Sequence, residues 1–283
     1  MTAPAFADPG RDQLLSVAEI QQALRVVRAA KPAAAVRDDP PEPSGGGSAA
    51  AAALQPDWIA VVAAHSGAGA SSVALAITDA LSARGERARL IETAVPTRSG
   101  LVAATATEFG LDDSGDWRRG SRGAATVYRR ACDESPAGWP PANPGTSTVV
   151  DLGLPAAASI QRIANERPHL VVVCRPTIPG VRLAEHLLGH FDDGMAIAVA
   201  AVGPRRWPGE VDASLGSHLV RLRESGRVVA VPLERRLSVT GPSHLPLSKA
   251  VVEAGADLLR LLAEASEQSG RSRRPSRKTG SVG

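Results

Sequence analysis

Lysine is nearly absent from this sequence. Only Lys31, Lys249 and Lys278 occur in the 283 residues, so the long stretch between the first two carries its permanent positive charge on arginine. Aromatic residues make up 3% of the chain, which excludes a core built mainly from rings. Because hydrophobic residues still reach 43%, we expect an ordinary globular domain with an aliphatic core.

Cysteine and long apolar runs are also scarce. Cys132 and Cys174 are far apart, and their spacing is typical neither of a disulfide framework nor of a metal site. No apolar run is long enough to span a bilayer, and the chain does not start with a basic and then apolar signal segment. The sequence therefore predicts a cytoplasmic protein without a membrane span.

The net charge of +3 depends on one end of the chain. Residues 271–283 hold five basic residues and no acid, and without these five the formal charge falls to −2. The body of the chain is therefore not a basic surface for nucleic acid. We predict a disordered basic tail over residues 266–283, which either contacts DNA non-specifically or only keeps the chain soluble.

Residues 1–30 are predicted to contain one short amphipathic helix. Ser16 and Glu19 have the spacing of a capping box. Its apolar face would consist of Val17, Ile20, Leu24 and Val27. Residues 31–56 are rich in Pro, Ala and Gly, which predicts a disordered linker. A helix on such a linker is expected to dock on a protein partner, to pack on the domain's own surface, or to fray.

Residues 57–265 alternate between strand and helix patterns. The predicted strands are 59–64, 88–92, 148–152, 170–174, 195–202 and 228–231. The predicted helices are 72–84, 156–166, 181–188, 214–224 and 247–265. Apolar strands separated by helices predict an α/β domain with a single doubly wound, mainly parallel sheet. Residues 112–144 fit this pattern less well, and we expect surface loops there around a helix at 124–132.

Residues 65–72, after the first strand, read His-Ser-Gly-Ala-Gly-Ala-Ser-Ser. A strand, a glycine turn and a helix in this order are typical of a phosphate-binding loop, in which backbone N–H groups and the helix dipole face an anion. Such loops carry a lysine just before the Ser or Thr, and here that position holds Ala70. The candidate binding residues are Gly67, Ala68, Gly69, Ala70, Ser71 and Ser72.

One interpretation of this loop is a Rossmann-like dinucleotide site. Gly67-x-Gly69-x-x-Ser72 approximates G-x-G-x-x-G, and Glu92 ends the second strand where an acid would bind a ribose hydroxyl. Ser72 replaces the third glycine, and no catalytic acid or base is evident near the strand ends. A dinucleotide-binding oxidoreductase therefore stays open as an alternative.

A second interpretation rests on a resemblance to the ParA/MinD-type partitioning ATPases, a deviant branch of the P-loop NTPases. Their loop follows K-G-G-x-G-K-T-T, and here Gly67 and Gly69 match glycines while Ser71 and Ser72 match the hydroxyl pair. Matches in the same order continue over residues 58–262, which is most of the predicted domain.

The later matches are four. The strand that ends in Asp151-Leu-Gly153 resembles the family's second acidic motif, in which the acid supports Mg²⁺ and the glycine senses the γ-phosphate. The strand followed by Pro232 resembles one whose proline helps form the base pocket. Weaker matches lie at residues 167–177 and 245–250. The resemblance implies a three-layer P-loop sandwich that takes ATP or ADP with Mg²⁺, the metal held by Ser71 and Asp151, and a homodimer that switches with nucleotide.

Departures from the family pattern lower the expected activity. His65 and Ala70 replace both family lysines, and Ala94 replaces an acid that helps place the attacking water. Because phosphoryl transfer depends on positioning and charge neutralisation, we expect weak or no ATP hydrolysis and assign no catalytic residue. Arg98 and Arg205 are candidates to replace the missing lysine. The chain is interpreted as a regulatory or scaffolding partner in a positioning, partitioning, secretion or conjugation system. The alternative is that Gly67 and Gly69 form only a tight turn between strand and helix and that the loop binds no nucleotide.

Two further groups of residues are weaker candidates. His186 and His190 lie one turn apart on a predicted helix, but no third metal ligand is evident, so we expect a solvated helix face. Trp117, Trp139 and Trp207 are expected to anchor loops rather than to stack on bases.

Overall fold

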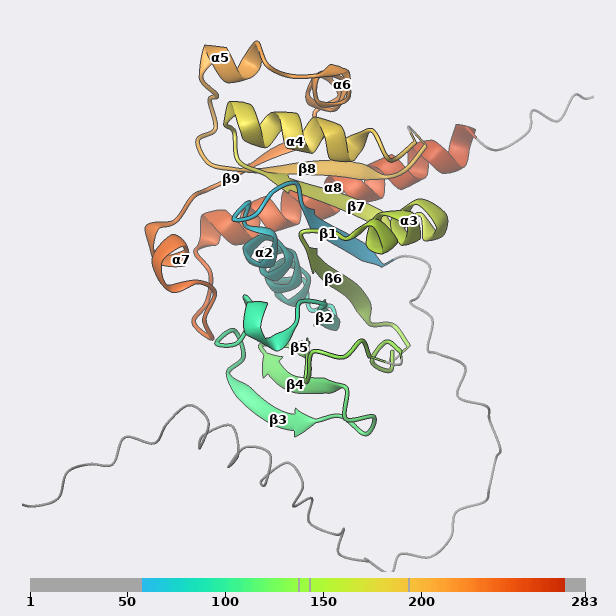
Figure 1. Cartoon of the computed structure of the whole chain (residues 1–283), viewed down its shortest axis with the longest axis vertical. Coiled ribbons are helices and arrows are strands. Elements are labelled where there is room, and N and C mark those ends of the chain that lie inside the picture. Colours follow the sequence, from blue (N-terminus) through green and yellow to red (C-terminus); the bar gives the residue numbers. More distant parts are fainter. Residues whose placement is uncertain (1–57, 137, 143, 193, 273–283) are drawn as a thin grey trace, which may run out of the picture. The chain divides into compact units, whose positions relative to one another are not determined.

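A computed structural model of the chain describes residues 58–136, 138–142, 144–192 and 194–272. The predicted N-terminal helix and linker, and the end of the predicted basic tail, lie outside these residues. The described part forms three layers, with a mixed sheet between two groups of helices (Figure 1).

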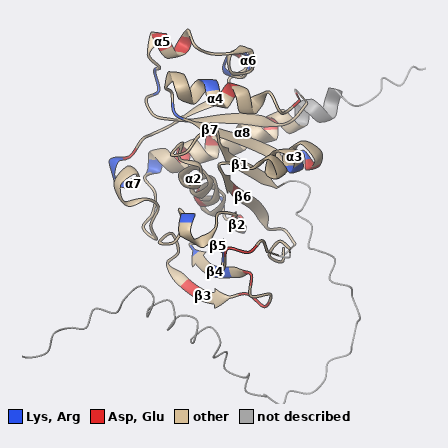
Figure 2. Ribbon diagram, in the orientation of Figure 1, with Lys and Arg blue, Asp and Glu red and all other residues tan. Residues whose placement is uncertain are grey.

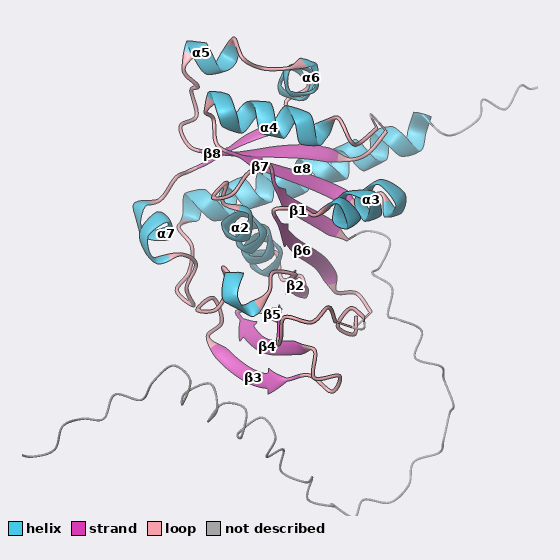
Figure 3. Ribbon diagram, viewed as in Figure 1, coloured by secondary structure: helices cyan, strands magenta, loops and turns pink. Residues whose placement is uncertain are grey.

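The sheet in the described residues follows the order β3-β4-β5-β2-β6-β1-β7-β8-β9 (Figure 3). The strands are β1 Ile59–Ala63, β2 Ala88–Glu92, β3 Thr107–Leu111, β4 Trp117–Arg122, β5 Ala125–Arg130, β6 Ser147–Gly153, β7 His169–Cys174, β8 Ile197–Val202 and β9 Val228–Val231. All neighbours from β5 to β9 pair in parallel, whereas β4 pairs antiparallel with both β3 and β5. The carboxyl ends of the parallel strands therefore meet at one edge, where ligand sites form in such folds.

Helices cover both faces because the central strands are apolar on both faces. The helices are η1 Pro96–Arg98, α2 Ala70–Ala83, α3 Ala157–Glu166, α4 Ile178–Leu188, α5 Gly209–Asp212, α6 Ser217–Glu224, α7 Arg235–Thr240 and α8 Lys249–Ser272. All five residues of β1 are buried. Its odd-numbered residues pack in one core with α2 and α8, and its even-numbered residues pack in a second core with α3, α4 and α6. This arrangement confirms the predicted doubly wound, mainly parallel α/β fold.

The segment 112–144 differs from the sequence-based prediction. The helix predicted at 124–132 is wrong, because these residues form strand β5, which is paired with β4 across a two-residue turn. Gly123 opens that turn at φ 55°, a conformation that suits glycine and a tight hairpin. Buried Val127 packs in the core that contains α2 and α8, whereas buried Trp117 and Tyr128 pack in the core on the opposite face. We call β3, β4 and β5 the antiparallel extension.

Several helices also differ from prediction. The helix predicted at 214–224 begins at Ser217 as α6, and the short α5 before it and α7 after β9 were not predicted. Helix α8 continues to Ser272, past residue 265, where we predicted the domain to end. The polar first turns of α6 and α7 carry little apolar periodicity, which is the signal that sequence-based helix assignment needs.

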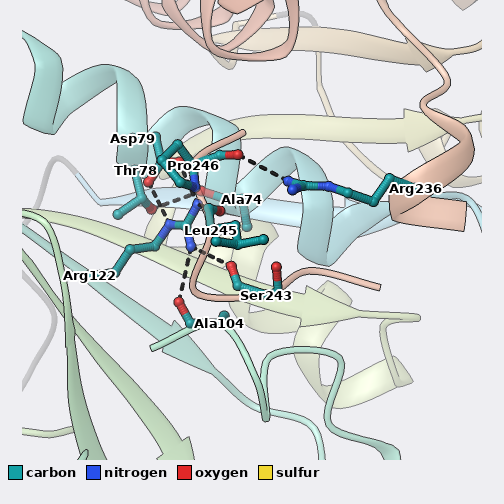
Figure 4. A network of polar contacts seen from close by, with 9 residues as sticks. All are labelled: Ala74, Thr78, Asp79, Ala104, Arg122, Arg236, Ser243, Leu245 and Pro246. Carbon is teal, nitrogen blue, oxygen red and sulfur yellow. Dashed lines mark hydrogen bonds and ion pairs between the residues drawn. The ribbon is translucent and has the colours of Figure 1, made fainter. Parts of the chain in front are cut away.

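Arg122 joins the antiparallel extension to the body of the sheet (Figure 4). Its side chain lies at the end of β4, is 4% exposed, and forms a two-point ion pair with Asp79 of α2 at 2.7 and 2.8 Å. Its remaining N–H groups donate to the carbonyl oxygens of Ala104, Ser243 and Leu245 at 2.6 to 3.1 Å. All five guanidinium donors therefore have acceptors, which is what burial of an arginine requires.

Charged residues divide the sheet into two parts (Figure 2). Strands β1, β7 and β8 carry no Asp, Glu, Lys or Arg. The antiparallel extension carries Glu108, Arg118, Arg119, Arg122, Arg129 and Arg130. The centre of the sheet is thus held by apolar packing, whereas the extension also depends on ion pairs and hydrogen bonds.

Candidate functional site

The glycine loop connects β1 to α2 at the carboxyl edge of the sheet. Gly67 and Gly69 have φ 73° and φ 103°, which side chains other than glycine rarely adopt. The buried Ala68 between them anchors the loop. A Cβ built on Gly69 would lie 3.4 Å from Val202 at the end of β8, so the loop packs closely on the neighbouring strand.

Unpaired backbone donors line this loop. Within the described residues, the N–H groups of Gly69, Ala70, Ser71 and Ser72 donate no hydrogen bond to a backbone or side-chain acceptor, whereas the N–H of Val73 donates to Gly69 at 3.0 Å. The first turn of a helix leaves such donors without intrahelical partners, and together with the helix dipole they suit an anion. Ala70 adds only a buried methyl group here.

Asp151 lies beside the loop, at the carboxyl end of β6. It is 2% exposed, and its Oδ1 accepts a hydrogen bond from the Gly153 N–H at 2.9 Å. Burial raises the pKa of the Asp151 carboxyl, while hydrogen bonding from the Ser71 hydroxyl and the Gly153 N–H partly counters this. The predicted neighbours Ser71 and Asp151 are therefore brought together.

Glu92 is a second buried carboxyl beside the loop. We call the region where the glycine loop meets the carboxyl ends of β2 and β6 the corner. It pairs with Asp151 in the register of β2 and β6, and it is 1% exposed. The Ser99 hydroxyl donates to its Oε2, and the Gly100 N–H donates to its Oε1 at 2.6 Å. The pKa of Glu92 is raised from 4.5 to about 7, and burial is the largest cause. The hydrogen bonds from Ser99 and Gly100 lower this pKa, whereas the charge of Asp151 raises it.

These contacts of Glu92 bear on the dinucleotide interpretation. Both carboxylate oxygens accept hydrogen bonds from the turn at Ser99 and Gly100, so a ribose diol would have to compete with these contacts. A Cβ on Gly100 would lie 2.8 Å from the Ser71 hydroxyl oxygen, which places this turn directly against the start of α2. Glu92 therefore belongs to the same corner as Ser71 and Asp151.

A cavity of about 1200 Å³ opens at this corner. Its lining includes all six loop candidates from Gly67 to Ser72, together with Glu92 and Asp151. Pro232, predicted to contribute to a base pocket, is not among the described residues that line it, and is exposed after β9. Of the two arginines proposed to replace the missing lysine, Arg98 lines the cavity and Arg205 does not.

Two more arginines and two tryptophans line the same cavity. Trp117 and Trp139 stack with ring centroids 6.2 Å apart, and the Arg162 guanidinium lies 4.5 Å from the centre of the Trp139 ring. Arg130 donates to the carbonyl oxygen of Asp133 at 2.6 Å and also to that of Glu134. Trp117 is buried at the start of β4 rather than in a loop, which corrects its predicted placement. Sequence reasoning identified Arg98 but not Arg130, Arg162 or the stacking of the two tryptophans. We call Arg98, Arg130 and Arg162 the arginine group.

His65 adds no positive charge to the loop. Its Nε2 accepts from the backbone N–H of Arg175 at 3.1 Å, and its Nδ1–H donates to the carbonyl oxygen of Ser66 at 2.9 Å. A backbone N–H can only donate and a carbonyl can only accept, so the two contacts fit a neutral ring with its hydrogen on Nδ1. His65 thus ties the loop to the end of β7.

The chemistry of this corner fits a metal-bound phosphate. Ser71, Asp151 and Glu92 offer only oxygen donors, which are the ligands that Mg²⁺ prefers. The loop offers N–H groups that suit phosphate oxygens. Elsewhere, His186 and His190 form an edge-to-face ring pair at 5.3 Å. No group of three or more His, Cys, Asp or Glu side chains suited to a metal occurs in the part of the chain that the structure describes.

Among the helices in the described ranges, none is both long enough and apolar enough to cross a membrane.

Comparisons with known proteins bear on the fold. No protein-family model matches the sequence, and no curated protein sequence matches it. The structure is similar to the septum site-determining protein MinD of Pyrococcus horikoshii, solved with Mg-ADP, at a TM-score of 0.48 and 14% identity, covering 77% of this chain and 99% of that chain. A ParA family ATPase of Chlorobium tepidum gives a TM-score of 0.47 and 14% identity, covering 72% of this chain and 99% of the other. The Aquifex aeolicus MinC:MinD cell division complex gives the same score and identity over 72% and 96% of the chains. These three solved structures thus contain MinD or ParA family proteins.

Proposed function

We propose that this chain binds ATP or ADP with Mg²⁺ at the glycine loop and acts as a ParA/MinD-like regulatory or scaffolding protein with weak or no ATP hydrolysis. The observation that carries this proposal is one cavity that combines unpaired loop N–H groups with the oxygen donors of Ser71, Asp151 and Glu92. A loop that served only as a tight turn would need no such cavity beside it. Within the cavity, Ser71 and Asp151 would hold the metal, and the N–H groups of residues 69–72 would hold the phosphates.

Weak hydrolysis follows from two alanines in the cavity. Ala70 stands where a lysine would neutralise phosphate charge, and Ala94 stands where an acid would place the attacking water. Phosphoryl transfer depends on charge neutralisation and on positioning, so both losses act on the rate rather than on the fold. Binding depends more on backbone donors and is expected to survive.

Calorimetric titration of the purified chain with ADP and with ATP, each with Mg²⁺, tests this proposal. We expect saturable binding, together with an ATP turnover close to the buffer blank. Asp151→Asn should weaken the Mg²⁺-dependent part of the binding, whereas Asp113→Asn, at an exposed position of the β3–β4 loop, should leave it unchanged. Absence of any nucleotide binding would refute the proposed site, and rapid Mg²⁺-dependent turnover would refute the regulatory role.

The biological setting is proposed from the sequence resemblance alone. A protein partner would bind through residues 1–30, the chain would form a homodimer, and the basic tail would contact DNA non-specifically. Light scattering with and without ADP measures the oligomer, and a salt-dependent DNA affinity that disappears on deletion of residues 271–283 measures the tail. The dinucleotide alternative predicts saturable NADPH binding that Glu92→Ala weakens.

A further inference from the structure

The cavity contains a positive charge at a place where the loop motif does not supply one. Every side chain of the glycine loop from Gly67 to Ser72 is uncharged, and the two carboxyls beside it, Glu92 and Asp151, are acidic. A bound polyphosphate would therefore meet no cation from the loop itself. The cations that line the same cavity are the arginine group, Arg98, Arg130 and Arg162.

Two members of the arginine group are already engaged. Arg162 forms an ion pair with Glu166 at 2.7 Å and lies over the Trp139 ring. Arg130 donates to three backbone carbonyl oxygens, those of Thr93, Asp133 and Glu134, which hold its guanidinium against the chain. Moving either side chain toward a ligand would break these contacts.

Arg98 differs from both. Its side chain is exposed, and within the described residues the structure shows no hydrogen bond or ion pair of its guanidinium. Arg175 also approaches the loop, but its Nε donates to the carbonyl oxygen of Gly67 at 3.4 Å and it does not line the cavity. Arg98 is therefore the cavity cation that is available to a ligand.

The backbone that carries Arg98 is fixed beside the loop. Pro96 begins the η1 turn, and the next two residues after Arg98 bind Glu92 through the Ser99 hydroxyl and the Gly100 N–H. Gly100 in turn packs against Ser71, since a Cβ there would lie 2.8 Å from the Ser71 hydroxyl oxygen. Arg98 thus stands two residues from a direct contact with the start of α2. Only its long side chain is left to move.

We infer that Arg98 supplies the phosphate-neutralising charge that Ala70 lacks, and that the ligand class is the polyphosphate of a nucleoside di- or triphosphate. The guanidinium reaches the phosphates from the segment after β2, whereas a lysine at position 70 would reach them from the loop. A guanidinium suits this task because its planar fork donates two parallel hydrogen bonds to phosphate oxygens. This inference rests on the proposed function, because it names the cation of the same site.

Calorimetric titrations with ADP and with pyrophosphate, each with Mg²⁺, test Arg98→Ala against Arg205→Ala as the matched control. Both variants remove one exposed arginine near the carboxyl edge of the sheet, but only Arg98 lines the cavity. We expect Arg98→Ala to weaken both ligands at least about tenfold, which corresponds to about 1.4 kcal/mol. Arg205→Ala should bind as the unmodified chain does. Arg98→Lys should recover part of the loss, because it keeps the charge without the planar fork.

A double variant makes the assignment sharper. If Arg98 does the work of the missing lysine, adding Ala70→Lys to Arg98→Ala should restore the affinity for pyrophosphate. Equal affinity of Arg98→Ala and the unmodified chain, or equal losses in Arg98→Ala and Arg205→Ala, would overturn the inference and leave the proposed function in place. Failure of the unmodified chain to bind ADP or pyrophosphate would overturn both.

Discussion

The cavity is built from two regions of different composition. The loop side, residues 67–72, presents backbone N–H groups and small side chains without charge. The arginine group comes from η1, from the end of β5 and from α3, and it presents long charged side chains. In the proposed phosphate site, one contiguous segment would therefore supply the shape, whereas the charge would come from outside that segment.

The largest expected effect comes from breaking the attachment of the antiparallel extension, which carries Arg130. Arg122→Ala leaves the partly buried charge of Asp79 without its partner and deprives three carbonyl oxygens of donors. We expect a loss of about 3–5 kcal/mol in the free energy of unfolding, measured by urea denaturation. Arg118→Ala, an exposed position on the same strand, should change it by less than about 0.5 kcal/mol. Equal effects of the two variants would show that the Arg122 contacts do not hold the extension.

The next largest effect is the pH dependence of stability that Glu92 causes. Glu92 lines the same cavity as the loop and the arginine group. Because the pKa of Glu92 is raised from 4.5 to about 7 in the folded chain, the unfolded chain loses this proton at lower pH than the folded chain does. The stability that Glu92 contributes is therefore complete below about pH 4.5 and is lost as the pH rises to about 7, a fall on the order of 3 kcal/mol. Burial raises the pKa of Asp151 too, so this residue acts in the same direction.

Denaturation midpoints across this pH range measure the contribution. Glu92→Gln should flatten the fall in stability, leaving the part due to Asp151. Glu86→Gln, at an exposed position just before β2, should retain the full fall. An unchanged slope in Glu92→Gln would contradict the assignment of this titration to Glu92.

The smallest effect tests the loop side alone. Gly69→Ala places a side chain at φ 103° and within 3.4 Å of Val202, and we expect a loss of about 1–2 kcal/mol in thermal unfolding experiments. Gly209→Ala is the control, because a Cβ there meets no atom within 4 Å and the residue begins helix α5. It should be at least as stable as the unmodified chain. A comparable loss at both glycines would mean that the geometry of the loop is not the cause.

Much of the fold follows from local sequence signals. The strands 88–92 and 228–231 were predicted with the bounds that the structure has, because short apolar runs flanked by charged residues, glycine or proline mark buried strands clearly. The helix predicted at 124–132 failed because a short run of mixed polar and apolar residues fits either period. The neighbouring strands decide between helix and strand here, because β5 forms backbone hydrogen bonds with β2 on one side and with β4 on the other.

Prediction of the site was limited in the same way. The loop residues and Asp151 could be placed together, because each follows a strand or opens a helix at the carboxyl edge of a parallel sheet. That they bind nucleotide stays a prediction. Arg98 was named as a candidate from the sequence, but its grouping with Arg130 and Arg162 could not be found, since the three are separated by more than thirty residues in sequence. One signal existed: had β5 been recognised as a parallel strand, Arg130 at its end would have been placed at this edge.

The five acceptors of Arg122 have a consequence for the order in which the chain acquires its structure. Two of them, the carbonyl oxygens of Ser243 and Leu245, lie 121 and 123 residues further along the chain. During synthesis, the guanidinium of Arg122 leaves the ribosome long before these acceptors exist. Contacts of such high contact order form late, after the closure of a long loop has been compensated by other interactions. The antiparallel extension and the segment before α8 are therefore expected to reach their final structure in the same late step. In a fragment that ends before Ser243, the extension would lack these two hydrogen bonds of Arg122.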